Sequence, residues 1–368
     1  MSEHDVAERL TTALGIRHPI VLGPFGGLSS VELTAAVSEL GGLGSYGLYG
    51  YDAARIAETA TELRAATRRP FALNLWLPLE MDGEGFDTRR PTGGATRPPA
   101  KPASFDDAVS ALRGFFEELD LPVPTPPERY LPSFDEQWSA VLQAQPAVAS
   151  FVFGVPPAEV VASARERGIL LVGTATSVDE AIALQAGGVD AIVATGLEAA
   201  GHRVSFLRPA ESALVGSISL IPQVVDAVDV PVIAGGGIAD RRGVAAAFAL
   251  GASAVQVGTA FLRTRQSAAN DAHRNAIAST PAHDTVLTRA MSGRLSRGAA
   301  NRAVRSIEQG GAIAPFPVQN WLTGRFRIEA GRRNLGELQS LWLGQSAPLA
   351  VHDEASDVFA ELVAGVPA

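Results

Sequence analysis

The sequence predicts a closed (β/α)8 barrel, and three observations support this fold class. Short apolar runs bounded by glycine or proline recur eight times between residues 19 and 258. Amphipathic stretches with helix-start and helix-stop residues lie between most of these runs. Near-continuous apolar runs are typical of parallel strands buried on both faces, and eight strands alternating with helices complete such a barrel. A doubly wound open sheet is the alternative.

The predicted strands are short, and most of them end at a glycine. In chain order they are Pro19–Gly23, Leu43–Gly47, Phe71–Trp76, Val148–Phe153, Ile169–Gly173, Asp190–Thr195, Pro231–Gly235 and Ala254–Gly258. The predicted helices between them begin near capping residues or proline, and several end at glycine. They are Ser29–Leu40, Asp52–Thr67, Pro157–Arg167, Ser177–Gln185, Ile221–Val228 and Asp240–Leu250.

Two parts of the chain depart from this alternation. Residues 78–132 hold 10 of the 24 prolines, and only Phe105–Leu119 among them has a helical pattern. We expect a Pro/Gly-rich insertion after the third strand, which rises from the catalytic mouth as a lid or as a passive loop. Residues 266–368 show no strand pattern and are expected to form a mostly helical extension on the barrel mouth. The predicted domains are therefore residues 1–265 and 266–368.

Arginines are concentrated in this C-terminal part of the chain. The simplest interpretation of such a charge run is a solvated face. The residues concerned are Arg289, Arg294, Arg297, Arg302 and Arg305.

Composition excludes several kinds of chemistry. The 368 residues contain no cysteine, so a disulfide framework, a Cys zinc site and a thiolate nucleophile are excluded. The single lysine, Lys101, lies in a proline-rich stretch, which argues against Schiff-base enzymes. A net charge of −9 argues against nucleic acid or an anionic membrane as a partner. Without a secretory signal or a long apolar run, we expect a cytoplasmic protein.

The last two predicted strands run directly into glycines. The first continues as Gly235, Gly236 and Gly237, and the second as Gly258 and Thr259. Glycine lets backbone N–H groups approach an anion, and the loops after strands seven and eight form the usual phosphate site of such barrels. These five residues are therefore predicted to hold a phosphate. The alternative is that they only form tight turns.

His202 follows the sixth predicted strand on a loop that also contains Gly201. A histidine at this mouth can take up a proton near neutral pH, although it could instead only serve the loop. No metal is expected, because no second histidine or pair of carboxylates lies nearby at ligand spacing.

Two further positions could meet a flat ring system. Asn74 is an amide in an apolar strand, and its partner is either a flavin ring edge or a neighbouring strand. Pro24, Phe25 and Gly26 end the first strand, where small residues would let a ring approach the backbone or would simply turn the chain.

Together these motifs resemble the nitronate monooxygenase family, formerly called 2-nitropropane dioxygenases, which are FMN-dependent (β/α)8 barrels. The resemblance covers most of residues 15–265. It rests on Pro19–Pro24, Ala35–Val37, Gly41–Gly44, Phe71–Asn74, Phe153–Gly154, Glu198–Arg203, Ala234–Ile238, Ala246–Ala252 and Gln256–Thr259.

The resemblance implies an activity, oxidation of alkyl nitronates or nitroalkanes by O2 to a carbonyl compound and nitrite. It implies that His202 removes the α-proton or positions the nitronate. It also implies FMN contacts from Asn74 and from the glycine loops, with Gln256 included. Thr195 stands where the family commonly has glutamine, and with Gly201 it completes the predicted FMN-binding set. A homodimer is the assembly considered.

Three alternatives remain at this point. A related FMN enzyme could pass hydride from NAD(P)H to an enoyl thioester on the same barrel. A non-redox barrel could use the phosphate site alone, and a flavin-binding protein could lack catalysis.

Overall fold

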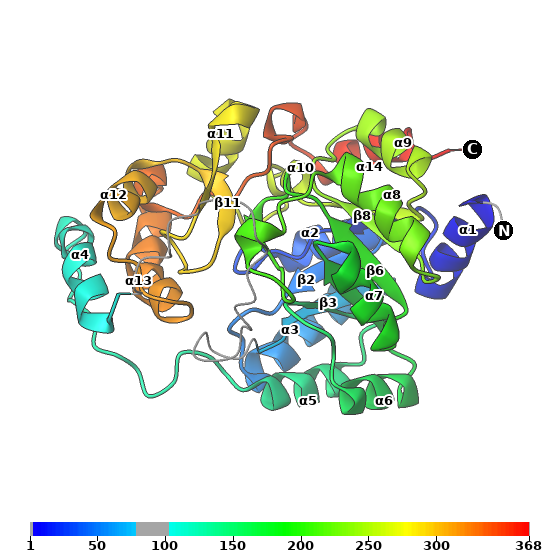
Figure 1. Cartoon of the computed structure of the whole chain (residues 1–368), viewed down its shortest axis with the longest axis horizontal. Coiled ribbons are helices and arrows are strands. Elements are labelled where there is room, and N and C mark those ends of the chain that lie inside the picture. The colour runs from blue at the N-terminus through cyan, green and yellow to red at the C-terminus, as the bar shows by residue number, and fades with distance from the viewer. Residues whose placement is uncertain (1–2, 79–102, 368) are drawn as a thin grey trace, which may run out of the picture.

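A computed structural model describes residues 3–78 and 103–367, and it contains an eight-stranded parallel barrel surrounded by helices (Figure 1). The strands pair in the order β1, β9, β8, β6, β5, β4, β3, β2. A bridge between Val21 and Leu43 connects β1 to β2 and closes the ring, which confirms the predicted fold class. The strands are β1 (Ile20–Leu22), β2 (Gly44–Gly47), β3 (Phe71–Trp76), β4 (Val148–Val152), β5 (Leu170–Ala175), β6 (Ala191–Thr195), β8 (Val232–Gly235) and β9 (Ala254–Val257).

All eight strands lie within two residues of their predicted limits, because they are buried and most of them are apolar runs. The helices that follow them around the barrel are α2 (Val31–Glu39), α3 (Ala53–Ala66), α5 (Phe134–Ala144), α6 (Ala158–Glu166), α7 (Val178–Ala186), α8 (Ser217–Ala227) and α9 (Arg241–Ala249). The sequence reading missed α5. The predicted helix Ile221–Val228 also starts too late, since α8 begins at Ser217 and contains Pro222 in its interior. No helix in residues 3–78 or 103–367 is long and apolar enough to cross a membrane.

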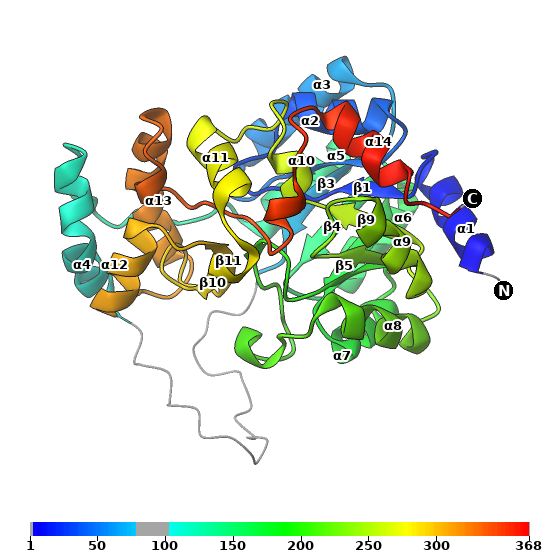
Figure 2. The ribbon, with the colours of Figure 1, turned by 90° about the horizontal axis from the view of Figure 1, so that it is seen from above.

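A helix that was not predicted, α1 (Glu3–Leu14), fills the end of the barrel away from the strand C-termini. Leu10 and Leu14 pack against inward-facing residues near the strand starts, such as Val148 and Ala254. This burial stabilises the helix, and such tertiary support is common. Figure 2 shows α1 beside the C-terminus, far from the helices at the other end of the molecule.

The chain leaves the barrel after β9 through the short helix α10 (Thr259–Leu262) and forms what we call the C-terminal segment, residues 266–349. It contains α11 (Asp271–Ser279), β10 (Thr285–Thr288), β11 (Ser296–Ala299), α12 (Arg302–Gly310) and α13 (Val318–Arg332). Two strands lie in this segment although its sequence shows no strand pattern. β10 and β11 pair with each other, and β11 also pairs with β7 (Gly201–His202), so β11 is stabilised by partners elsewhere in the chain and needs no apolar run.

The described part of the insertion also joins this segment. Helix α4 (Phe105–Glu118) confirms the predicted helix and packs on α13, with the Phe115 and Phe326 ring centroids 5.1 Å apart (Figure 1). Residues 79–102 of the predicted insertion 78–132 lie outside the described residues, and its duty as a lid remains a prediction.

The last helix, α14 (Ala355–Val363), returns to the barrel. It contacts α2, α9 and β1, and so takes the place of the eighth barrel helix (Figure 2). A division of the chain at residue 265 therefore separates this helix from the helices that it contacts, and the two predicted domains remain a prediction.

Candidate active site

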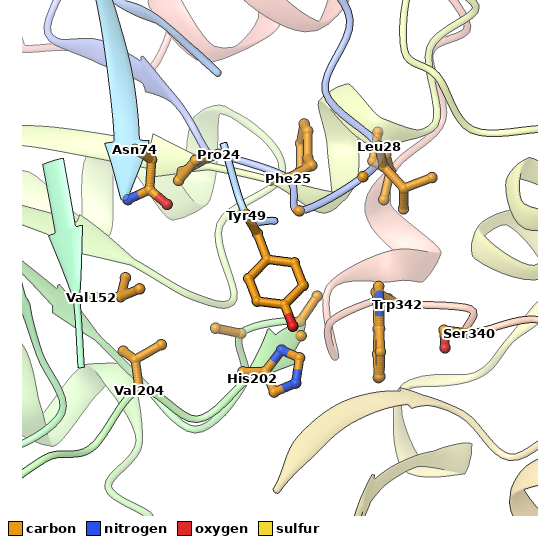
Figure 3. Close-up of a pocket in the computed structure, with 18 of the residues that line it drawn as sticks. Pro24, Phe25, Leu28, Tyr49, Asn74, Val152, His202, Val204, Ser340 and Trp342 are labelled. Carbon is orange, nitrogen blue, oxygen red and sulfur yellow. The ribbon is translucent and has the colours of Figure 1, made fainter. Parts of the chain in front are cut away.

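A cavity of about 850 Å3 opens at the C-terminal ends of the barrel strands, where the C-terminal segment covers them (Figure 3). All thirteen residues predicted from the sequence line it. They are Pro24, Phe25, Gly26, Asn74, Thr195, Gly201, His202, Gly235, Gly236, Gly237, Gln256, Gly258 and Thr259.

The glycines after β8 form a concave stretch of backbone. Gly236 and Gly237 have φ angles of +91° and +77°, which side chains rarely adopt. A Cβ atom at Gly236 would lie 3.1 Å from the Gly196 carbonyl oxygen. Neither the Gly236 nor the Gly237 N–H donates to an acceptor among the described residues. Unpaired backbone N–H groups that line a cavity are suited to an anion such as a phosphate.

The C-terminal segment closes this glycine loop. The Thr259 hydroxyl accepts a hydrogen bond from the Gly344 N–H at 3.0 Å, so its own proton remains available to a ligand. A Cβ atom at Gly344 would lie 2.7 Å from the Glu198 carbonyl oxygen, so the two chains meet backbone to backbone. The loop is therefore built by two parts of the chain that are far apart in sequence.

The turn after β1 is also held rigidly. Ser29 Oγ accepts from the Phe25 N–H at 3.2 Å and donates to the Phe25 carbonyl oxygen at 2.9 Å. On the neighbouring strand, Gly47 leaves no room for a side chain, because a Cβ atom there would lie 2.7 Å from the same carbonyl oxygen. The backbone of residues 24–26 therefore forms a fixed wall of the cavity.

The side chain of Asn74 bonds to a residue of the neighbouring strand. Its Nδ2 donates to Ser150 Oγ at 3.0 Å and to the Ser150 carbonyl oxygen at 3.2 Å on β4. Its Oδ1 accepts no hydrogen bond from the described residues, so this oxygen remains available to a ligand donor.

His202 lies on strand β7, and the C-terminal segment holds it there. Residues 201 and 202 pair with β11, and His202 Nε2 lies 2.8 Å from Ser292 Oγ. The imidazole also packs among aromatic rings, with centroids 5.0 Å from Trp76 and 5.6 Å from Trp342. Figure 3 shows it facing the middle of the cavity.

This environment keeps the histidine neutral. Burial, together with the nearby guanidiniums of Arg294 and Arg327, lowers the pKa of His202 to about 3. Arg327 lines the cavity, and its nearest acceptors are the Asn320 oxygens and Ser340 Oγ. Among the described residues no carboxylate pairs with Arg327, so a buried positive charge faces the cavity without a negative partner.

The expected solvated face of arginines is only partly present. Arg289 pairs with Glu211 and Arg302 with Glu118 at the surface. Arg297 is buried, however, and its Nε donates to the Leu197 carbonyl oxygen at 3.0 Å. The Arg294 guanidinium lies 4.0 Å from the Phe316 ring centroid. The expectation was wrong for these two because β11 and the turn before it face the barrel mouth.

Several cavity residues were missed by sequence reasoning. Tyr49 and Trp76 could have been found, since they lie at or just after the ends of predicted strands, where barrel sites are built. Asn320, Arg327 and Trp342 gave no such signal, because they reach the cavity from the C-terminal segment.

Comparison with known proteins identifies the family. A family model described as "Nitronate monooxygenase" matches residues 7–365. A protein of Staphylococcus aureus (strain MSSA476) named "Probable nitronate monooxygenase" is 37% identical over 357 residues, 96% of each chain. The chain belongs to the nitronate monooxygenase family.

Solved structures agree with this assignment. The nitroalkane oxidase of Streptomyces ansochromogenes has 34% identity and a TM-score of 0.84, and each chain covers 96% of the other. The FabK protein of Thermotoga maritima has 27% identity and a TM-score of 0.72, and the match covers 96% of this chain and 94% of that one. As a member of the nitronate monooxygenase family the chain is a flavin oxidoreductase that acts on a small molecule, and the family supports oxidation of nitroalkanes or nitronates.

Proposed function

We propose that this enzyme binds FMN and oxidises alkyl nitronates with O2 to carbonyl compounds and nitrite, with His202 at the reacting end of the substrate. Two nitronate anions and one O2 give two carbonyl compounds and two nitrite ions, so atoms and charge balance. One observation carries the proposal: a neutral His202 lies near the guanidinium of Arg327, which has no carboxylate partner among the described residues. Such a cavity favours a small anion.

The residues present fit a flavin mononucleotide. The unpaired N–H groups of Gly236 and Gly237, with the Thr259 hydroxyl, would bind the phosphate. The fixed backbone at residues 24–26 and the open Oδ1 of Asn74 would meet the ring. When bound, FMN supplies the electron transfer between the nitronate and oxygen.

Negative side chains hardly compete for this space. Among the described residues that line the cavity, Glu198 is the only carboxylate. Its two oxygens accept from the Ser217 N–H at 3.0 and 3.1 Å, where α8 begins, so it is already satisfied. The remaining charge around the cavity is positive and suits an anionic substrate.

The pKa of His202 bears on which form of the substrate reacts best. A neutral imidazole accepts a proton, but the imidazolium would lie close to two guanidiniums, which makes it unfavourable. A nitronate that is already ionised needs no such step, and it brings the negative charge that the cavity lacks. We therefore propose preformed nitronates as better substrates than neutral nitroalkanes.

Anaerobic mixing tests this proposal. The purified, flavin-loaded enzyme is mixed first with a nitronate and, in a separate sample, with NADH, and flavin absorbance is followed. We expect the nitronate to bleach the flavin and NADH to leave it oxidised. Bleaching by NADH alone, followed by consumption of an enoyl thioester, would replace the proposal with the reductase alternative. A colourless protein that takes up no FMN would favour the non-redox barrel.

A further inference from the structure

Tyr49 lies in the turn after β2 and is not among the residues that the family motifs pick out. We propose that Tyr49 is a second catalytic residue, whose hydroxyl donates a hydrogen bond to an oxygen of the bound nitronate, across Trp76 and Phe316 from His202. The inference rests on the proposed function, since it names the group that would bind the oxygens of that substrate.

A chain of hydrogen bonds prepares the Tyr49 hydroxyl to donate. Asn320 Nδ2 donates to Tyr49 Oη at 2.9 Å, and Asn320 Oδ1 accepts from Arg327 Nη2 at 2.7 Å. Because Tyr49 Oη accepts the Asn320 proton, its own proton is left for another acceptor. Among the described residues no acceptor takes it. The positive charge of Arg327 polarises this chain toward the cavity, which strengthens the outgoing bond.

The aromatic rings of Trp76 and Phe316 hold Tyr49 and His202 next to the same part of the cavity. The Tyr49 ring centroid lies 4.3 Å from that of Trp76 and 6.0 Å from that of Phe316. The His202 ring packs on the same two side chains, at 5.0 and 6.5 Å. Figure 3 shows the Tyr49 hydroxyl and the His202 imidazole pointing toward one another in the cavity. A small planar group held between them would meet a donor on one side and an imidazole on the other.

The chemistry of a nitronate calls for such a donor. Its negative charge lies largely on the two oxygens, and a hydrogen bond aimed at such an oxygen is strong in a water-poor site. Burial raises the pKa of Tyr49 to about 12, so the hydroxyl keeps its proton at ordinary pH and presents no competing negative charge. His202 can then act on the carbon end while Tyr49 binds the oxygen end.

Nitrite binding tests the inference apart from turnover, because nitrite has the same O–N–O group. The flavin-loaded wild type and Tyr49→Phe are titrated with sodium nitrite by calorimetry. The substitution keeps the ring against Trp76 and removes only the donor, so we expect the Kd to rise about 10-fold or more. Asn320→Ala, which keeps the hydroxyl but cuts its link to Arg327, should weaken nitrite binding by about 3-fold.

Tyr46→Phe is the matched control. Its hydroxyl bonds to that of Tyr51 at 3.2 Å outside the cavity, so we expect an unchanged Kd, and the bound flavin absorbance verifies that each variant is folded. Equal nitrite affinity in wild type and Tyr49→Phe, or no nitrite binding by wild type, would overturn the inference. If nitronate fails to reduce the wild-type flavin while Tyr49→Phe still weakens nitrite binding, the proposed function is wrong and the anion site at Tyr49 stands.

Discussion

The barrel and the C-terminal segment contribute to the cavity in different ways. The barrel offers backbone groups, namely glycine N–H groups after β8 and the turn held by Ser29, together with the side chains of Asn74 and Tyr49. The segment offers side chains and restraints, namely Arg327, Asn320, Trp342 and the strand and serine that hold His202. The barrel side suits a cofactor phosphate and ring, whereas the segment side sets the charge and shape around the reacting atoms. Cofactor binding and substrate chemistry should therefore respond to different substitutions in this protein.

The largest effect on turnover without loss of flavin is expected at His202, where the barrel and the C-terminal segment meet. His202→Ala should retain flavin and lower kcat/KM for a neutral nitroalkane by roughly 10²–10⁴-fold, because proton transfer is lost. The loss should be smaller with preformed nitronate, which needs no deprotonation. Steady-state nitrite release measures both. His283→Ala, at an exposed histidine, is the control, and equal losses on the two substrates would contradict proton abstraction.

Gly236→Val should disrupt only the glycine loop after β8, on the barrel side of the cavity. The backbone at this position has a φ of +91°, which valine resists, and the new side chain would press on the Gly196 carbonyl oxygen. We therefore expect flavin affinity to fall by about 100-fold. Flavin absorbance per mole of protein after gel filtration measures this. Gly168→Val is matched, because Gly168 has a φ of +67° with open space around it and does not line the cavity. Similar flavin loss in both variants would show that backbone strain, and not the phosphate loop, is responsible.

Acid should weaken the C-terminal segment through His273 on α11. This side chain is 2% exposed, and its Nε2 lies 2.8 Å from the Trp342 carbonyl oxygen. Burial lowers its pKa from 6.5 to about 4, so between pH 6.5 and about pH 4 the unfolded state binds a proton that the folded state does not. The stabilisation is therefore complete above pH 6.5 and is lost as the pH falls toward 4, by about 2 kcal/mol at pH 5.

Urea unfolding at pH 7.5 and pH 5.0 measures this effect. His273→Gln cannot take up the proton, so its loss of unfolding free energy between the two pH values should be smaller than that of wild type by about 2 kcal/mol. His283→Gln, at the surface, should behave as wild type. An unchanged pH dependence in His273→Gln would mean that other groups cause the acid sensitivity.

Arg327→Gln should have the smallest effect of the four, on the segment side. Removing the charge takes away one of the causes that lower the pKa of His202, so that pKa should rise. The KM for nitronate should increase about 10-fold, because the cavity loses its unpaired positive charge. Flavin retention should be unchanged. Arg333→Gln, whose guanidinium pairs with Glu329 at the surface near the end of the same helix, is the control. Loss of flavin in Arg327→Gln would instead place this charge beside the cofactor.

The cofactor side could be predicted far better than the substrate side. Gly235–Gly237 and Gly258 stand out because each follows an apolar strand directly, and the order of strands fixes which loops meet. Tyr49 was predictable in principle for the same reason. Strand β11 was not, because its Ser, Arg and Gly carry no strand pattern until β10 and β7 pair with it.

The sequence by itself determined the barrel, its eight strands, the glycine loops and the position of His202, because these depend on local patterns of a few residues. Only the tertiary structure decided that α14 completes the barrel and that α4 packs with α13. It also decided that Arg327, Asn320 and Trp342 share a cavity with His202. These relations depend on contacts between residues far apart in the chain, where burial and pairing outweigh local preference.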